Sequence, residues 1–276
     1  MLLSALHVYP VKSCRGIAPA RWRLDAYGLG GDRSWMVVDA AGRYLTQREL
    51  PRLALVGTRL DGERSILSAP GRAPLELPPA GTRLGDVAIE VWRHSGPAID
   101  GGDDAARWIS AHLGVPARLV AVPRGHARPV NREWFPGDAQ TTFSDGYPLL
   151  LISEGSLDDL NTRLPKPLPM ERFRPNLVVR GAEPYAEDLW KRIRVGDVEL
   201  AVVKPCSRCA ITTTDQATGA RDGVEPLRTL ARYRKTELGV VFGQNVVHLA
   251  TGTLEVGAPV EVLETRLALR VRPEQD

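Results

Sequence analysis

The amino-acid sequence predicts a mixed α/β fold that is rich in β-strands and divided into two domains. In the first third of the chain, short apolar runs alternate with Gly, Pro and Asp, which is typical of strands joined by turns. Apolar residues at helical spacing occur only in a few short segments. The segment Pro123–Pro136 is rich in Pro, Arg and Gly and has no periodicity. We therefore expect domains at 1–122 and 123–265, followed by a tail at 266–276.

One helix is expected in the first domain, at Asp103–Leu113. Its apolar residues follow helical spacing, and Gly114 stands where a helix commonly ends in a left-handed residue. The other apolar runs of this domain predict strands at Ala5–Tyr9, Ser34–Asp39, Leu53–Leu60, Val87–Arg93 and Ala117–Val122.

The second domain is expected to be a small β-barrel decorated by short helices. One helix should begin after Ser156, interpreted as its N-cap, and another at Pro226, since Pro favours the first helical position. Buried strands are expected at Leu149–Ile152 and Leu177–Val179. Turn residues between apolar runs predict two hairpins, Ile193–Val195 with Val198–Val203 and Thr253–Val256 with Pro259–Leu263.

The composition excludes several classes of protein. Apolar residues make up 43% of the chain, charged residues 25%, and the formal net charge is only +3. No basic run is interleaved with aromatic residues, so we expect no nucleic-acid partner. The apolar start Met1–Leu6 is too short for a secretory or membrane-spanning segment, so we expect no membrane association. Three cysteines form no disulfide framework, and we therefore expect a cytoplasmic location.

The most informative segment is Cys206-Ser207-Arg208-Cys209, which contains two of the three cysteines. A redox-active dithiol needs its first cysteine at the start of a helix, whereas this pair precedes β-branched Thr212–Thr214. A zinc site needs four ligands, and the remaining cysteine and five histidines are not at ligand spacing. On spacing alone, a pair of buried and inert cysteines remains an equally good interpretation.

Three other loops carry polar and cationic side chains next to predicted strands, at Tyr9–Gly16, Gly28–Trp35 and Arg172–Asn176. Each of them alone is best explained as a solvated turn. Arginine outnumbers lysine by a wide margin, which reflects either genomic composition or a use of rigid forks for phosphate. Taken together, the four loops would suit a large anionic cofactor, with one thiolate completing the coordination of a metal.

These loops carry a resemblance to a known family. The motifs YPVKSCRG, GDRSWMVVD and LTQRELP resemble the MOSC N-terminal β-barrel domain. The later motifs LISEGSLDDLN, RFRPNLVV, PCSRC and FGQN resemble the MOSC domain. The resemblance covers about residues 3 to 263, and the motifs occur in the same order as in the family. Within the family, the chain is most similar to the mitochondrial amidoxime-reducing component and its bacterial counterparts.

The resemblance implies a molybdenum cofactor, a phosphate-bearing pyranopterin whose dithiolene binds molybdenum together with one protein thiolate. It implies that Cys209 is the metal ligand and the catalytic residue, with Cys206 in a supporting role. Asp215 would orient the ligand loop, and Cys14 has no assigned role. The chain departs from the family where a Thr-Ser pair is replaced by Gly146-Tyr147. The implied cofactor-binding residues are Lys12, Ser13, Arg33, Arg174, Asn176, Ser207 and Arg208.

The activity implied is the molybdenum-dependent reduction of N-hydroxylated small molecules such as hydroxylamines, amidoximes and N-hydroxylated bases. Because a [2Fe–2S] cluster normally takes four cysteines and the chain has three, we expect electrons from an external ferredoxin or flavoprotein reductase. The alternative is a non-catalytic protein that binds the molybdenum cofactor or carries sulfur as a persulfide on Cys209. The N-terminal domain and the lack of a fused desulfurase favour the reductase.

Overall fold

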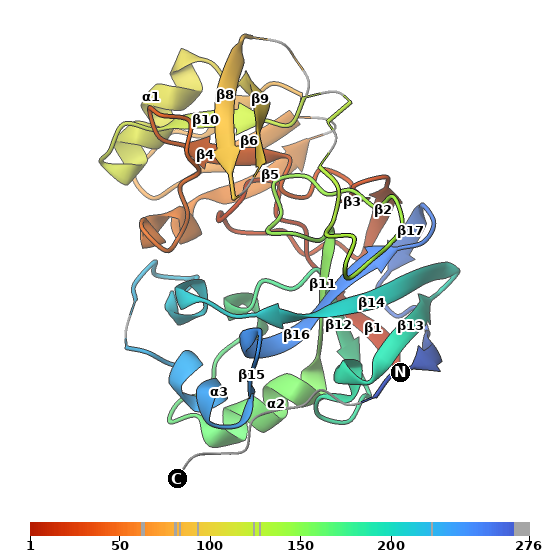
Figure 1. Cartoon of the computed structure of the whole chain (residues 1–276). Helices are drawn as coiled ribbons and strands as arrows, with labels where there is room; N and C mark the ends of the chain where they lie inside the picture. The colour runs from red at the N-terminus through yellow and green to blue at the C-terminus, as the bar shows by residue number, and fades with distance from the viewer. Residues whose placement is uncertain are drawn as a thin grey trace.

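Two β-rich halves lie one above the other in the computed structural model (Figure 1). It describes residues 1–61, 64–79, 82, 84–92, 94–123, 125–126, 128–221 and 223–267. The upper half in Figure 1 is built mostly from the first part of the chain, and the lower half mostly from the second. This arrangement agrees with the mixed α/β, β-rich fold that the sequence predicts.

The largest sheet belongs to the lower half and is antiparallel except where β11 (Leu149–Ser153) meets β12 (Leu177–Arg180). Its two edge strands are β1 (Leu2–Leu6) and β18 (Val260–Thr265). Backbone hydrogen bonds join β1 to the residues just before β18, from Leu3 N to Ala258 O (2.9 Å) and from Gly257 N to Leu3 O (2.7 Å). The sheet therefore curls until its edges meet, around a core that includes Leu200 and Val246. The strand order is β1 (Leu2–Leu6), β12 (Leu177–Arg180), β11 (Leu149–Ser153), β16 (Gly239–His248), β14 (Val198–Ser207), β13 (Trp190–Val195) and β18 (Val260–Thr265), with β15 (Lys235–Thr236) paired to β16.

Three smaller sheets complete the described β-structure. Their strand orders are β4 (Trp35–Val38), β10 (Arg118–Ala121), β9 (His94–Asp100) and β8 (Asp86–Val91); β5 (Gly57–Asp61), β6 (Arg64–Ser68) and β7 (Leu75–Leu77); and β17 (Gly252–Glu255), β2 (Arg21–Asp25) and β3 (Gly28–Leu29). The last of these joins β2 and β3 to the late strand β17, while β1 lies in the lower sheet. Figure 1 shows β1, in red, beside β12. The halves thus exchange strands, which ties the first loops of the chain to the second half.

Helices cover the sheets and bury their apolar faces. Helix α1 (Asp103–Leu113) packs Ile109 and Leu113 into the core of the upper half. Helices α2 (Glu154–Arg163) and α3 (Leu227–Tyr233) enclose Phe242 of β16 with Leu160 and Leu230. The described residues also form four short 3₁₀ helices, at η1 (Pro51–Leu55), η2 (Met170–Arg172), η3 (Ala186–Asp188) and η4 (Ala210–Thr213).

Several predicted elements are confirmed. Helix α1 has the predicted bounds, and Gly114 adopts the left-handed conformation with φ 77°. Strands β13 and β14 form the predicted antiparallel hairpin. The strands predicted around β4, β8, β10, β11 and β12 are present with ends shifted by at most two residues, and Arg93, the end predicted for β8, lies outside the described residues.

Other predicted elements are wrong. The strand expected at Leu53–Leu60 begins only at Gly57, because Pro51 lacks a ladder donor and starts the helix η1 instead. The strand expected at Ala5–Tyr9 is displaced toward the N-terminus, and it ends as β1 at Leu6. Strands β17 and β18 were expected to pair with each other but pair with β2 and β13, since local turn chemistry does not specify distant partners.

The predicted helix caps also differ. The N-cap of α2 is Ser153, whose Oγ accepts a hydrogen bond from Ser156 N at 3.1 Å, so Ser156 lies inside the first turn. Pro226 precedes α3 as its N-cap rather than occupying its first position. Most of the tail expected at 266–276 lies outside the described residues, which end at Leu267.

Candidate functional site

All four loops singled out from the sequence meet at one cleft. Its empty volume is about 780 Å³, counting the part that is open to solvent. The lining contains residues from the first and the second half of the chain. Every predicted site residue lines it, namely Lys12, Ser13, Arg33, Arg174, Asn176, Ser207, Arg208 and Cys209.

The first loop contributes a buried ammonium group. Lys12 is 5% exposed, and its Nζ donates to the carbonyl of Phe143 at 2.8 Å and to Asp145 Oδ1 at 2.5 Å. Burial lowers the pKa of Lys12, and the adjacent Asp145 carboxylate opposes this change. The cation is therefore fixed by a loop that belongs to the second half of the chain.

Backbone strain concentrates around the cleft. Ser13, Arg33 and Arg174 all have positive φ angles, of 66°, 46° and 55°. A non-glycine residue in the left-handed region costs about 1–3 kcal/mol unless the surroundings impose it. Of the five such residues in the described part of the chain, these three line the cleft, so the strain is concentrated at this site.

Two guanidinium groups pack against one tyrosine ring. The Cζ atoms of Arg33 and Arg174 lie 4.3 Å and 4.2 Å from the ring centroid of Tyr9. Arg33 Nη1 also donates to Asp32 and to Asn176 Oδ1, at 2.5 Å and 3.0 Å. Burial raises the pKa of Tyr9 to about 12, although the neighbouring cations oppose this. Tyr9 therefore remains a neutral platform that holds the two arginines side by side.

Asn176 acts within the protein rather than as a free donor. It is 1% exposed, and its Oδ1 accepts hydrogen bonds from Arg33 and from Leu150 N at 3.2 Å. Its Nδ2 donates to the carbonyl of His7 at 3.1 Å. The amide thus joins the loops of both halves and positions Arg33, and its predicted contact with a cofactor stays a prediction.

Arg174 retains an unused donor. The side chain is buried at 9% exposure, and Nη1 donates to the carbonyl of Cys14 at 2.7 Å. Its Nη2 is buried and has no hydrogen-bond partner among the described residues. Burial lowers the pKa of Arg174 to about 10, so the group is still protonated at neutral pH. An unpaired cationic donor in a cleft is the arrangement expected of an anion-binding group.

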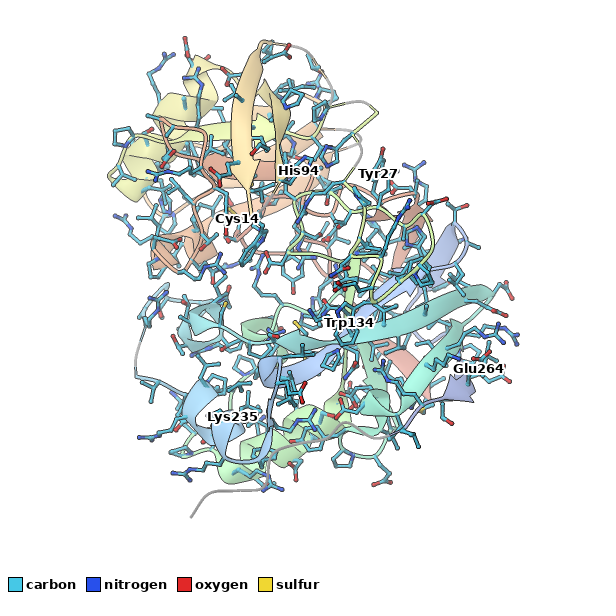
Figure 2. All side chains as sticks on the ribbon, viewed as in Figure 1. Cys14, Tyr27, His94, Trp134, Lys235 and Glu264 are labelled. Atoms are coloured by element: carbon cyan, nitrogen blue, oxygen red, sulfur yellow. The ribbon has the colours of Figure 1, made fainter. Side chains whose placement is uncertain are left out.

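The three cysteines have different surroundings. Cys14 is fully buried, and burial raises the pKa of its thiol to about 12, which makes it a poor metal ligand. Figure 2 shows Cys14 in the upper half, near its border with the lower half. Cys206 and Cys209 are both half-buried at the cleft, where Cys206 Sγ accepts a hydrogen bond from Arg208 Nη1 at 3.0 Å. Cys209 immediately precedes helix η4, and its sulfur lies 3.7 Å from Arg48 Nη1.

The remaining predicted residues hold the loop around the cysteines. Ser207 Oγ donates to the carbonyl of Leu238 at 2.7 Å, and Arg208 Nη2 donates to that of Phe173 at 2.6 Å. Asp215 Oδ2 accepts from Arg172 Nη2 at 3.0 Å, and Arg172 also donates to the carbonyl of Thr213. Asp215 therefore orients the segment that follows Cys209 through Arg172.

Sequence reasoning missed a loop that forms one wall of the cleft. Ser144 and Asp145 line it directly. Arg128, which is 7% exposed, donates to the carbonyls of Thr142 and Ser144 at 2.7 Å and 2.5 Å and so fixes this loop from behind. The signal available in the sequence was the run of turn residues before the strand that became β11. Arg128 itself stood in a segment without periodicity, where no local pattern assigns a partner.

Gly146 and Tyr147 also line the cleft, at the position where the chain departs from the family motif. There is open space where a Cβ of Gly146 would lie, with no atom within 4 Å. The hydroxyl of Tyr147 is buried without a hydrogen-bond partner in the described part of the chain. This segment therefore adds room but no side-chain hydroxyl comparable to a Thr-Ser pair.

The donor set fits a phosphate-bearing cofactor with a thiolate-bound metal. Lys12, Arg33, Arg174 and Arg208 bring positive charge to the cleft, and Arg174 has a free donor. Cys209 supplies a sulfur at the same place. Among the described residues, no group of three or more His, Cys, Asp or Glu side chains has a geometry that could hold a metal ion. No helix in the described ranges is both long and apolar enough to cross a membrane.

Comparisons with known proteins decide the family. Residues 1–116 match the family of the MOSC N-terminal beta barrel domain, and residues 138–261 match that of the MOSC domain. Mitochondrial amidoxime-reducing component 1 of Homo sapiens is 38% identical over 95% of this chain and 82% of its own length. Mitochondrial amidoxime reducing component 2 of Rattus norvegicus is 37% identical over 94% of this chain and 82% of its own length. This chain belongs to the family of the amidoxime-reducing components.

Membership in the amidoxime-reducing component family confirms the resemblance seen in the sequence and corrects one expectation. A cytoplasmic location was expected from the cysteine content, but it is contradicted by these relatives, which are named as mitochondrial components. A low cysteine count indicates a reducing compartment and does not distinguish one such compartment from another. The domain boundary expected at residues 122 and 123 stays a prediction.

Proposed function

We propose that this protein is a molybdenum-cofactor-dependent reductase of N-hydroxylated compounds and that it receives its electrons from an external protein. The observation that carries the proposal is the cleft, which combines four cationic side chains with the sulfur of Cys209. The names of its relatives support reduction of amidoximes as the kind of reaction. Hydroxylamines and N-hydroxylated bases contain the same N–O bond and are included as substrates.

Lys12, Ser13, Arg33, Arg174, Ser207 and Arg208 would hold the phosphate and pterin of the cofactor. The unpaired Nη2 of Arg174 supports this assignment most directly, because a buried guanidinium gains most from an anionic acceptor. Asn176 holds Arg33 in place through its amide oxygen, 3.0 Å from Nη1. Cys209 supplies the thiolate ligand, and Cys206 supports the loop through its hydrogen bond from Arg208.

The reaction breaks the N–O bond of the substrate. The substrate takes up two electrons and two protons, and it leaves as the corresponding N–H compound and water. When bound, the molybdenum cofactor supplies a two-electron metal centre for this step. The chain itself binds and orients that group with its four cationic side chains and with the Cys209 thiolate.

The cysteine count of this chain supports an external donor. A [2Fe–2S] cluster normally takes four cysteine thiolates. The chain has three cysteines; Cys14 is buried in an apolar core, and Cys209 is assigned to molybdenum. We therefore assign re-reduction to a separate ferredoxin or flavoprotein reductase.

The proposal is tested by producing the protein in a host that makes the cofactor and measuring molybdenum, pterin oxidation products and amidoxime reduction with reduced viologen. We expect one molybdenum per chain, and we expect Cys209→Ala to lose both metal and activity. Cys206→Ala, the matched variant, should retain molybdenum. Wild-type protein without molybdenum would refute the proposal, and loss of metal only in Cys206→Ala would reverse the ligand assignment. Cyanide-releasable sulfur without reductase activity would favour the sulfur-carrier alternative.

A further inference from the structure

Arg48 approaches the sulfur of Cys209 from the opposite half of the molecule. It belongs to the segment between β4 and η1 and is far from the Cys206–Cys209 motif in sequence. Its Nη1 lies 3.7 Å from Cys209 Sγ, within the range of a hydrogen bond to sulfur. The arginine of the motif itself, Arg208, donates from Nη1 to the other sulfur, that of Cys206. Each of the two sulfurs at the cleft thus has its own guanidinium partner.

Aromatic rings restrain the Arg48 side chain. Its Cζ lies 5.1 Å from the ring centroid of Trp92 and 5.9 Å from that of Tyr44, within the range of cation–π attraction. The two rings are themselves in contact, with centroids 5.6 Å apart. Trp92 has a positive φ of 56°, a strained conformation that directs this 43% exposed indole toward the arginine. Only 22% of the Arg48 side chain is exposed, so the guanidinium is held in one place before any ligand binds.

The backbone of this segment is anchored to the cofactor loop of the first half. Gln47 is fully buried, and its Nε2 donates to the carbonyl of Ser13 at 2.7 Å. Thr46 Oγ1 donates to Glu49 Oε2 at 2.7 Å, which closes the turn locally. Arg48 is therefore attached to the same loop that contributes Lys12 and Ser13 to the cleft.

The same segment is anchored to the loop that follows Cys209. The side-chain amides of Gln47 and Gln216 exchange two hydrogen bonds, at 2.9 Å and 3.0 Å. Arg221 donates to the carbonyls of Gln47 and Arg48, the latter at 3.1 Å. These contacts join the two halves near Cys209 and fix the backbone from which the Arg48 side chain extends.

We propose that Arg48 is a positioning residue of the reaction centre, which orients the Cys209 sulfur and withdraws charge from it through an N–H···S hydrogen bond. This role rests on the proposed function. Hydrogen bonds to ligand sulfurs stabilise the more negative, reduced state of a metal centre and so raise its reduction potential. Arg48 also supplies positive charge next to the thiolate without taking part in the Cys206–Cys209 motif.

The experiment compares Arg48→Met with three other variants of the molybdenum-loaded protein. Arg48→Gln keeps a polar side chain but removes the charge. Arg221→Met loosens the anchored segment without removing the guanidinium from Cys209. Arg43→Met removes an exposed arginine that pairs with Asp39 and is the matched control. Molybdenum content, midpoint potential by spectroscopic redox titration, thermal unfolding, and kcat and KM for an aromatic amidoxime are measured for each.

For Arg48→Met we expect near-normal molybdenum content, a lowered midpoint potential, and kcat reduced about 10- to 100-fold with little change in KM, the usual effect of removing a partner of a metal ligand. Arg48→Gln should lower the potential in the same direction, and this variant decides the case if Arg48→Met does not take up metal. Arg221→Met should lower the unfolding temperature with the potential unchanged, and Arg43→Met should change neither.

Two outcomes would overturn the role of Arg48. One is a loaded Arg48 variant with the wild-type potential and kcat, and the other is an equal shift of potential in Arg221→Met, which would assign the effect to the anchored segment instead. Either result would leave the proposed function intact. Wild-type protein that takes up no molybdenum would overturn both proposals together.

Discussion

Arg174 donates a hydrogen bond to the carbonyl of Cys14, from Nη1 at 2.7 Å, and this contact holds its guanidinium while Nη2 stays buried without a partner among the described residues. The cost of leaving a buried donor unpaired is about 1–3 kcal/mol or more for a charged group. An anion that accepts from Nη2 would recover that cost on binding. The relationship therefore explains how Cys14, although too buried to react, contributes to the site through its backbone.

Replacing Arg174 should reduce cofactor retention more than it reduces stability. In Arg174→Lys the charge remains, but an ammonium cannot donate to Cys14 and to an anion in the fixed geometry of a fork. We expect the affinity for the cofactor to fall at least about tenfold, equivalent to about 1.4 kcal/mol of binding free energy, and the molybdenum content to fall with it. Metal analysis of gel-filtered protein checks this. The exposed Arg132, which pairs with Asp138, provides the control Arg132→Lys, and equal metal loss in both variants would contradict the prediction.

Removing the Asp188 carboxylate should destabilise the second half strongly. Asp188 accepts from Arg234 Nη2 and from Gln244 Nε2, both at 2.6 Å, and the side chains of Asp188 and Arg234 are 9% and 6% exposed. Breaking a buried ion pair from one side costs about 3–5 kcal/mol because the other charge stays uncompensated. We expect this loss for Asp188→Ala in denaturant unfolding. Asp138→Ala, in an exposed pair with 92% of the Asp138 side chain accessible, should remain within about 1 kcal/mol of wild type.

Gly42 should tolerate no side chain. Its φ is 76°, and a Cβ added there would lie 2.1 Å from the carbonyl oxygen of Ala88, which is backbone and cannot move independently. Gly42→Ala combines this clash with a left-handed conformation that costs about 1–2 kcal/mol for a residue with a Cβ. We expect a loss of more than about 2 kcal/mol in the free energy of unfolding. Gly71 has a similar φ of 70°, but a Cβ added there would meet no atom within 4 Å. Gly71→Ala therefore measures the cost of the left-handed conformation alone. Equal losses of stability in the two variants would disprove the clash at Gly42.

Stability should fall as the pH is lowered from about 6.5 to about 4 because of His126. Burial, together with the nearby His94 and Arg128, lowers the pKa of this imidazole to about 4. The ring also contacts Phe143 and has a buried Nε2 without a partner among the described residues. The unfolded chain therefore binds a proton near pH 6.5, while the folded chain binds it only near pH 4, so folding is penalised across this interval.

The pH effect is measured by urea unfolding at pH 7.5 and pH 5 for the wild type and His126→Gln. The variant should lose less stability between the two values than the wild type does. His112→Gln provides a comparison, since burial also lowers the pKa of His112 in a different part of the fold. An identical pH dependence in wild type and His126→Gln would show that His126 does not contribute.

Local patterns predicted some parts of the fold well. The bounds of α1 follow from its helical spacing and from Gly114, both of which are properties of neighbouring residues. The pairing of β17 with β2 was missed, because strand partners distant in sequence depend on how the whole chain packs. The N-cap of α2 was displaced by three residues because Ser153 and Ser156 are both good capping residues, and only the path of the chain distinguishes them.

The sequence by itself determined the family and singled out the loops that we propose bind a cofactor, since the motifs around Lys12, Arg33, Arg174 and Cys209 can be recognised without coordinates. Their convergence on one cleft, the unpaired donor of Arg174, and the approach of Arg48 to Cys209 came only from the folded chain. The physical reason is range. Motifs report interactions among neighbours in sequence, whereas a contact such as that between Arg48 and Cys209 exists only after the two halves have packed and fixed both side chains.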